Sequence, residues 1–335
     1  MQHARRILIA VLAIAALAAG ATVASASRGH DQKGDKGKGA AERLFTLQPD
    51  PAGNPEGIAF DKRSRSFFVG ITNGGAIYRG TLGSDTVTPF IDGAQGEAAV
   101  GLKVRRGKLY VAGGPTGSIT VYDLATPKKA PATFQTGAGG FLNDLVVTRR
   151  GDVYVTDSFR PTLWHVTAEQ VAAGSGTPQA LGVSAIPYEG AGAFNVNGIV
   201  AKGRNKLVVV DSNSGKLFRI KLGGDGASID EIDEIEGATV PGGDGLLLDR
   251  GRLVVVQGAP RNQLSFVKLR RGASTARLER TQTSDKLRGP STVDRAKGLY
   301  LVVNADFATS RKPFTVAGLP RKSKHGHGHG HEHDD

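Results

Sequence analysis

The chain of 335 residues contains no cysteine. This absence excludes disulfide bonds, cysteine nucleophiles and thiolate metal sites, so the fold must rely on its hydrophobic core. Histidine is also scarce away from the two ends: of eight histidines, only His165 lies between residues 43 and 320. A Ser-His-Asp triad is therefore not expected. We interpret His165 as a packed or surface residue on an outer strand.

Long apolar runs are confined to the N-terminus. Arg5 and Arg6 precede an apolar run over 7–19 and the small-residue tripeptide ASA at 24–26. This pattern is typical of an export signal that is cleaved near Ala26. Because no later run is long enough to cross a bilayer, we expect a secreted or extracytoplasmic protein without membrane insertion.

The net charge of +12 would suit a nucleic-acid or anionic-surface partner. Part of it lies in the ends, in Arg5 and Arg6 and in RKSK at 321–324. Between the ends the sequence has no basic helix and no basic patch interleaved with aromatic residues. We therefore expect a solvated charged surface and no nucleic-acid partner.

Low-complexity segments flank one large domain. Residues 1–26 are the predicted signal, and 27–42 form a charged, glycine-rich linker that cannot build a core. Residues 321–335, RKSKHGHGHGHEHDD, form a tail whose alternating histidines suit transition-metal binding or a purely solvated role. The body, 43–320, has short Val, Leu and Phe runs between Gly, Asn and Asp turns, which predicts an all-β domain. Only TAEQVAAG at 167–174 has a helical pattern.

The body is built from six repeated units. Their first strands are PEGIAF, AVGLKV, LNDLVV, VNGIVA, GDGLLL and PSTVDR, and equivalent positions recur every 43 to 54 residues. Each unit contains about four predicted strands, and both this number and the repeat length are typical of propeller blades. We therefore predict a six-bladed β-propeller of four-stranded blades. The last unit lacks its fourth strand, which RLFTLQ at 43–48 is expected to supply, so that the N-terminal strand closes the ring.

One position of the repeat is polar in most units. The equivalent residues are Glu56, Val100, Asn143, Asn197, Asp244 and Ser291. Because first strands line a propeller's channel, these side chains are predicted to form a ring around it. Its carboxylates and amides suit one divalent ion, Ca²⁺ first, with Mg²⁺, Mn²⁺ or Zn²⁺ as alternatives. Turn chemistry is the competing interpretation, but it explains Glu56 before Gly57 poorly.

The body resembles the SMP-30/gluconolactonase/LRE-like family of lactonase propellers. The matching residues are PEG (55–57), ND (143–144), NG (197–198) and GDG (243–245), with a YVTDS-type second strand (154–158). The resemblance spans nearly all of 43–320. It implies a metal-dependent lactonase in which Glu56, Asn197 and Asp244 are metal ligands, with Asn143 and Asp144 on the substrate side.

The chain also departs from that family. Phe141 stands where sugar lactonases often have arginine, and GIAF at 57–60 replaces a continuation to proline and tryptophan. Both changes favour an apolar substrate over a sugar lactone. The residues predicted to contact this substrate are Val100, Phe141, Asn143 and Ser291.

The resulting hypothesis is hydrolysis of a lactone or related ester, with the metal polarising the carbonyl group. Asp244, or failing that Asp144, is the predicted general base. Asp144 is notable because most of its counterparts in the repeat are glycine. The alternative is a non-enzymatic, metal-stabilised propeller that binds an extracellular ligand or partner.

Overall fold

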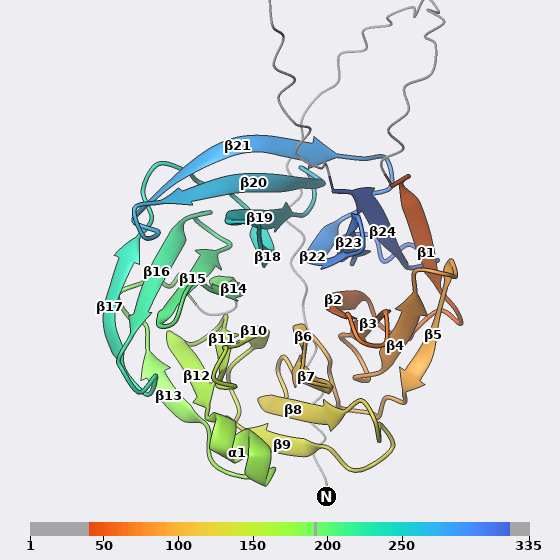
Figure 1. Ribbon diagram of the computed structural model, residues 1–335. Coiled ribbons are helices and arrows are strands. Elements are labelled where there is room, and N and C mark those ends of the chain that lie inside the picture. The colour runs from red at the N-terminus through yellow and green to blue at the C-terminus, as the bar shows by residue number, and fades with distance from the viewer. Residues whose placement is uncertain (1–39, 191–192, 322–335) are drawn as a thin grey trace, which may run out of the picture.

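The computed structural model describes residues 40–190 and 193–321 as sheets arranged around a central axis (Figure 1). The all-β prediction is confirmed, because strands β1 to β24 are accompanied by one short helix within these residues. No helix in the described part of the chain has the length and apolar character needed to span a membrane. The predicted signal, residues 27–39 of the linker and the tail beyond Arg321 lie outside the described residues.

Four of the five sheets have four antiparallel strands in chain order. They are formed by β6 (Leu102–Arg105), β7 (Lys108–Ala112), β8 (Ser118–Asp123) and β9 (Ala132–Gln135); by β10 (Leu142–Val147), β11 (Val153–Asp157), β12 (Thr162–Val166) and β13 (Gln179–Gly182); by β14 (Val196–Ala201), β15 (Lys206–Asp211), β16 (Leu217–Leu222) and β17 (Ile229–Glu234); and by β18 (Gly243–Asp249), β19 (Arg252–Gln257), β20 (Gln263–Arg270) and β21 (Thr275–Thr283).

The fifth sheet has eight strands because β1 connects the two ends of the chain. Its order is β2 (Pro55–Asp61), β3 (Ser66–Ile71), β4 (Ile77–Thr81), β5 (Thr86–Ile91), β1 (Arg43–Leu47), β24 (Thr315–Pro320), β23 (Leu299–Asn304) and β22 (Pro290–Ala296). Strand β1 pairs antiparallel with β24, as Phe45 lies opposite Val316. It also pairs parallel with β5, where Leu47 lies opposite Val87. The sequence pattern did not predict this second pairing.

The only helix among the described elements is α1 (Ala168–Ala173), which confirms the helical prediction at 167–174. The Thr167 side chain accepts a hydrogen bond from the Gln170 backbone amide, and the Gln170 side-chain oxygen accepts one from the Thr167 backbone amide. This reciprocal capping box satisfies two free amides of the first turn. Gly174 ends the helix in the left-handed conformation that glycine adopts without strain.

The first strand of each unit lies at the centre of the molecule (Figure 1). Around the axis β2, β6, β10, β14, β18 and β22 each lie beside the next, and β22 lies beside β2. Equivalent positions of neighbouring strands meet: the Ser291 hydroxyl donates to the Glu56 carbonyl oxygen at 2.8 Å. A Cβ atom on Gly57 would lie 2.0 Å from the Val100 carbonyl oxygen. The first strands therefore run in the same direction, in register and in close contact.

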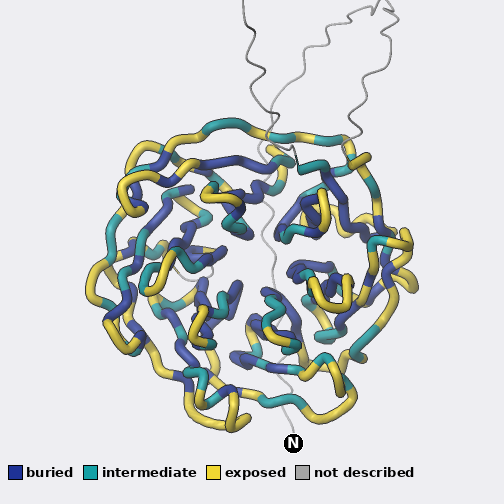
Figure 2. The backbone as a smooth tube through the Cα atoms, in the orientation of Figure 1, coloured by how far each residue is buried: buried dark blue, intermediate teal, exposed yellow. Residues whose placement is uncertain are grey.

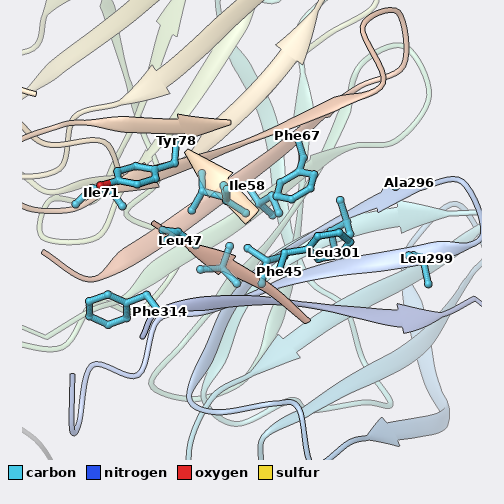
Figure 3. Packing of buried hydrophobic residues seen from close by; sticks show 14 residues of the cluster. Phe45, Leu47, Ile58, Phe67, Ile71, Tyr78, Ala296, Leu299, Leu301 and Phe314 are labelled. Atoms are coloured by element: carbon cyan, nitrogen blue, oxygen red, sulfur yellow. The ribbon is translucent and has the colours of Figure 1, made fainter. Parts of the chain in front are cut away.

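Hydrophobic packing fills the space between neighbouring sheets and between the two halves of the eight-stranded sheet. Figure 2 shows the central strands mostly buried, and the outer strands and connections largely exposed. In the cluster drawn in Figure 3, Phe45 and Leu47 of β1 pack with residues of β3 and β23. The Phe45 and Phe67 rings meet edge to face with centroids 5.2 Å apart. Because full burial of a Leu or Phe side chain contributes about 1.5–3 kcal/mol, β1 is held by its side chains as well as by its backbone hydrogen bonds.

Candidate functional site

The polar ring predicted from the repeat lies at irregularities of the first strands. The pairing of β2 with β3 shifts register between Pro55 and Ile58, around Glu56. Equivalent shifts occur at Asn143, Asn197, Asp244 and Ser291. A β-bulge of this kind re-aims a side chain and is common beside active sites. The same local device therefore presents five of the six ring residues.

Three acceptor atoms of this ring are buried without a hydrogen-bond partner. They are Oε2 of Glu56, Oδ1 of Asn197 and Oδ1 of Asp244. The other Glu56 oxygen, Oε1, accepts from the Thr292 hydroxyl at 3.2 Å. Buried acceptors without partners are costly and rare in native proteins. They belong to the three predicted metal ligands, and carboxylate and amide oxygens are the donors that a hard divalent cation takes, so the residues present fit such an ion.

The two ring carboxylates influence one another. Burial raises the pKa of Glu56 well above its usual value, and the charges of Asp244 and Asp144 raise it further. Burial also raises the pKa of Asp244 to about 7, again with a contribution from Asp144, while the Asn197 side chain acts in the opposite direction. Close buried carboxylates hold a proton unless a cation compensates their charge. Without a cation the ring carboxylates therefore tend to stay protonated, and a bound cation would favour their ionised forms.

The ring is poor in the side chains of transition-metal sites. Within residues 40–190 and 193–321, no three His, Cys, Asp or Glu side chains are grouped so that they could hold a metal ion. A metal at the ring would depend on two carboxylates and the Asn197 amide. Such an all-oxygen set suits Ca²⁺ better than Zn²⁺.

Asp144 is fixed on both of its oxygens. Its Oδ1 accepts from Lys103 Nζ at 2.9 Å and from the Leu145 amide at 2.8 Å. Its Oδ2 accepts a long bond of 3.4 Å from the Ile199 amide. The residue is only 3% exposed, so the ion pair with Lys103 largely compensates its buried charge. These bonds suit a positioning role for Asp144 better than proton transfer.

Lys103 and Asp294 are site residues that sequence reasoning missed. Each stands three positions after a ring residue, where the other units have Ala59, Val146, Val200 and Leu247. Burial raises the pKa of Asp294, although the Phe60 amide donates to it at 2.7 Å. The signal was present as two charged residues at an otherwise apolar position of the repeat.

The remaining ring residues are committed to internal contacts. The Asn143 amide nitrogen donates to the Ser158 hydroxyl at 3.0 Å, and Ser158 donates in turn to the Val196 carbonyl at 2.8 Å. The Ser291 hydroxyl holds the Glu56 backbone, and Val100 is buried. These residues join neighbouring first strands. That Asn143, Val100 and Ser291 contact a substrate stays a prediction.

Phe141 belongs to an aromatic cluster with Phe159 and Phe194. The centroid of Phe141 lies 5.4 Å from that of Phe159 and 5.0 Å from that of Phe194, and the last two are 5.2 Å apart. Phe159 is 37% exposed and Phe194 43% exposed. The cluster therefore presents an apolar surface next to the ring, because Phe141 is two residues from Asn143. Phe159 and Phe194 were not predicted.

Asp157 holds the aromatic cluster in place. Its Oδ1 accepts from the Phe141 amide at 2.9 Å and from the Phe159 amide at 3.1 Å. Its Oδ2 accepts from Arg160 Nε at 2.7 Å and from the Trp164 indole at 3.1 Å. The whole carboxylate is satisfied, which agrees with the structural role of a turn acid.

His165 takes no part in this site. It is buried, and its ring stacks on that of Tyr154 with centroids 4.6 Å apart. The prediction of a packed residue on a strand away from the ring is confirmed.

No family model and no curated protein sequence matches the chain. Solved structures do match. The allergen Mala s 1 of Malassezia sympodialis aligns at a TM-score of 0.62 and 15% identity, over 83% of this chain and 96% of the allergen. A gluconolactonase of Xanthomonas campestris aligns at a TM-score of 0.60 and 15% identity, over 84% of this chain and 90% of the gluconolactonase. A luciferin-regenerating enzyme aligns at a TM-score of 0.59 and 14% identity, over 84% of this chain and 96% of that enzyme. At these identities the likeness shows a shared propeller-type fold and no more.

Proposed function

We propose that the protein is an exported, divalent-metal-dependent hydrolase of a lactone or related ester. The single observation that carries this proposal is the set of three buried, unpartnered oxygens on Glu56, Asn197 and Asp244. Its fold would be a six-bladed propeller, with the eight-stranded sheet counted as two blades and β1 completing the last one. The likeness in fold to a gluconolactonase and to a luciferin-regenerating enzyme supports the same class of chemistry.

Glu56, Asn197 and Asp244 would hold the ion, most suitably Ca²⁺. When bound, the ion would supply Lewis-acid polarisation of the ester carbonyl group. Asp244 is the best candidate for the general base, because its carboxylate lies in the ring and would be ionised once a bound cation compensates its buried charge. The Asp244 carboxylate would take the proton from the attacking water. Asp144 would have a positioning role, because its hydrogen bonds to Lys103 and to the Ile199 amide join three neighbouring first strands beside the ring.

The aromatic cluster would bind the apolar part of the substrate. Phe159 and Phe194 are partly exposed, and Asp157 joins the two loops that carry Phe141 and Phe159. Phe141 stands where sugar lactonases often have an arginine. The site therefore lacks a cation at this position that could bind the hydroxyl groups or the carboxylate of a sugar acid. Aryl esters and lactones with an apolar substituent are therefore the favoured substrate class.

The proposal is tested by turnover of aryl esters and short lactones before and after chelation, with Ca²⁺, Mn²⁺, Mg²⁺ or Zn²⁺ restored. Asp244→Asn should abolish turnover while the protein still folds. Asp230→Asn, at a half-exposed carboxylate on the outer strand β17, is the matched control and should retain full activity. Unchanged turnover in Asp244→Asn refutes the assignment.

A second candidate function is non-enzymatic binding, with the ion only joining the central strands. It is favoured by the internal hydrogen bonds that occupy Asn143, Asp144 and Ser291. In that case chelation would lower the unfolding temperature, but no ester or lactone would be turned over with any of the four metals.

A further inference from the structure

The connections between first and second strands concentrate positive charge. There are six of them, each with at least one lysine or arginine, at 62–65, 106–107, 148–152, 202–205, 250–251 and 297–298. The only acidic residue in these connections is Asp152. Because the first strands run in the same direction, all six connections lie at one end of the channel, opposite the polar ring. Charges that are scattered in the sequence thus gather on one face, which the expectation of a merely solvated surface did not foresee.

A cavity of about 620 Å³ opens on this face. Its basic lining residues are Lys62, Arg65, Arg250, Arg295, Lys297 and Arg321, and the only acid that lines it is Asp249. We call it the basic pocket. Several of its lining residues stand at the ends of β18, β22 and β2. These three strands are neighbours around the axis (Figure 1). Asp249 is five residues beyond Asp244, so the basic pocket is about 15 Å from the ring along the strand.

The single carboxylate of the basic pocket is already fully used. Asp249 is buried and accepts from Arg321 at 2.8 Å, from Arg295 at 2.9 Å and from the Tyr300 hydroxyl at 2.9 Å. The single negative charge of Asp249 can therefore neutralise only one of the two arginines, Arg295 and Arg321, that bind it. The pocket offers no nucleophile and no unengaged carboxylate, so its chemistry is that of binding rather than reaction.

The other four cations of the basic pocket come from three different connections. They are Lys62, Arg65, Arg250 and Lys297, and all four are exposed. Among the residues that the structure describes, their side chains form no ion pair and no hydrogen bond. Like charges that converge on one cavity repel one another and destabilise the folded chain unless a counter-ion binds. The surplus positive charge is therefore available to a ligand.

We propose that the basic pocket binds one multiply charged anion through its phosphate or carboxylate groups. The volume lies in the range of small-molecule sites, and arginine and lysine side chains are the usual partners of both groups. Phe60, Leu82 and Ala296 line the same cavity and give the ligand an apolar side to contact. This site is separate from the proposed ester site and does not depend on it.

The test is calorimetric titration of the full chain with tripolyphosphate and, separately, with citrate. We expect saturable binding of one molecule per chain, weakening as sodium chloride rises from about 0.05 M to about 0.5 M because salt screens the charges. Replacing Lys62 and Lys297 by glutamate (Lys62→Glu with Lys297→Glu) should lower the affinity at least about tenfold, since two charge-assisted contacts are lost.

The matched control is Lys128→Glu with Lys129→Glu. It makes the same change of net charge in the connection between β8 and β9, with two exposed lysines that do not line the basic pocket. The control should keep its affinity within about twofold, because the screening length is about 8–10 Å at moderate salt. All four positions are exposed, and circular dichroism would verify folding.

Three results would overturn the proposal. Equal losses of anion affinity in both double variants would mean that the anion is attracted by the overall surface charge and not by the basic pocket. Binding only to vesicles of anionic phospholipid, with neither soluble anion bound, would mean a membrane-facing surface. No binding of either soluble anion at low salt would leave the basic pocket without a ligand function.

Discussion

Lys103 Nζ lies 2.9 Å from Asp144 Oδ1, in a pair that joins the first strands β6 and β10. The carboxylate side chain is 4% exposed and that of the lysine 22% exposed. Asp144 in turn raises the pKa of both Glu56 and Asp244. Lys103 therefore compensates the charge that acts on the proposed metal ligands.

Loss of Lys103 should be strongly destabilising. Lys103→Met leaves the Asp144 carboxylate buried without its cation, which typically costs about 3–5 kcal/mol. The free energy of unfolding is measured in urea. The double variant Lys103→Met with Asp144→Asn is the control and should regain most of the loss, because no unpaired charge remains. Equal stability of the single variant and the wild type would show that the pair contributes nothing.

Divalent ions should stabilise the protein through Glu56 and Asp244. At a free concentration of one hundred times the dissociation constant, an ion that binds only the folded state adds about 2.7 kcal/mol. Thermal unfolding with chelator and with added Ca²⁺ measures the effect. In Glu56→Gln the Ca²⁺-dependent shift should vanish, while the chelated variant should be at least as stable as the chelated wild type, since a buried acid whose ionised form is costly has been removed. A shift of the same size in Glu56→Gln contradicts the ligand assignment.

The metal-free protein should lose stability as pH rises from about 4 to about 8. The pKa of Asp244 in the folded state is raised to about 7 from 3.8, and that of Glu56 is also raised. The folded state therefore holds more protons than the unfolded state in this range, and the free energy of unfolding falls with pH. Urea unfolding in chelator at several pH values measures the slope. The fall of the unfolding free energy with pH should be shallower in Asp244→Asn. If the unfolding free energy of the wild type instead rises with pH, and Asp244→Asn does not alter that slope, the raised pKa of Asp244 is contradicted.

The aromatic cluster should select the substrate. Phe159→Ala or Phe194→Ala should lower kcat/KM for aryl esters about fivefold, because one aromatic contact is worth about 1 kcal/mol. Small aliphatic lactones, which do not reach the cluster, should be affected less. The control is Leu278→Ala, at an equally exposed apolar residue on the outer strand β21. If kcat/KM falls equally for aryl esters and for small aliphatic lactones, the cluster contributes to folding rather than to substrate selection.

Close packing of the first strands should make Gly57 intolerant of a side chain. The Cβ atom of Gly57→Ala would lie 2.0 Å from the Val100 carbonyl oxygen, so the backbones must separate. We expect a loss of about 3 kcal/mol or more, or failure to fold. At Gly182 on β13 a Cβ would meet no atom within 4 Å. Gly182→Ala is therefore the control and should be near neutral, as measured by thermal unfolding.

Local sequence patterns were enough to predict the strands, the helix α1 and the equivalent positions at which the ring residues stand. Short apolar runs with glycine turns are a local signal, and their repetition aligned Glu56, Asn197 and Asp244 without any knowledge of contacts. The bulges that present these side chains recur for the same reason, since each unit repeats the same local geometry.

The tertiary structure alone decided which of these positions interact and how. The second pairing of β1 with β5, the Lys103–Asp144 pair, the aromatic cluster and the basic pocket all join residues from different units. Lys62 and Arg250 are nearly two hundred residues apart, and only the return of the chain around the axis places them on one cavity. A repeat shows which positions are equivalent, but whether two equivalent or neighbouring side chains pair, stack or repel depends on their packing across the boundary between sheets.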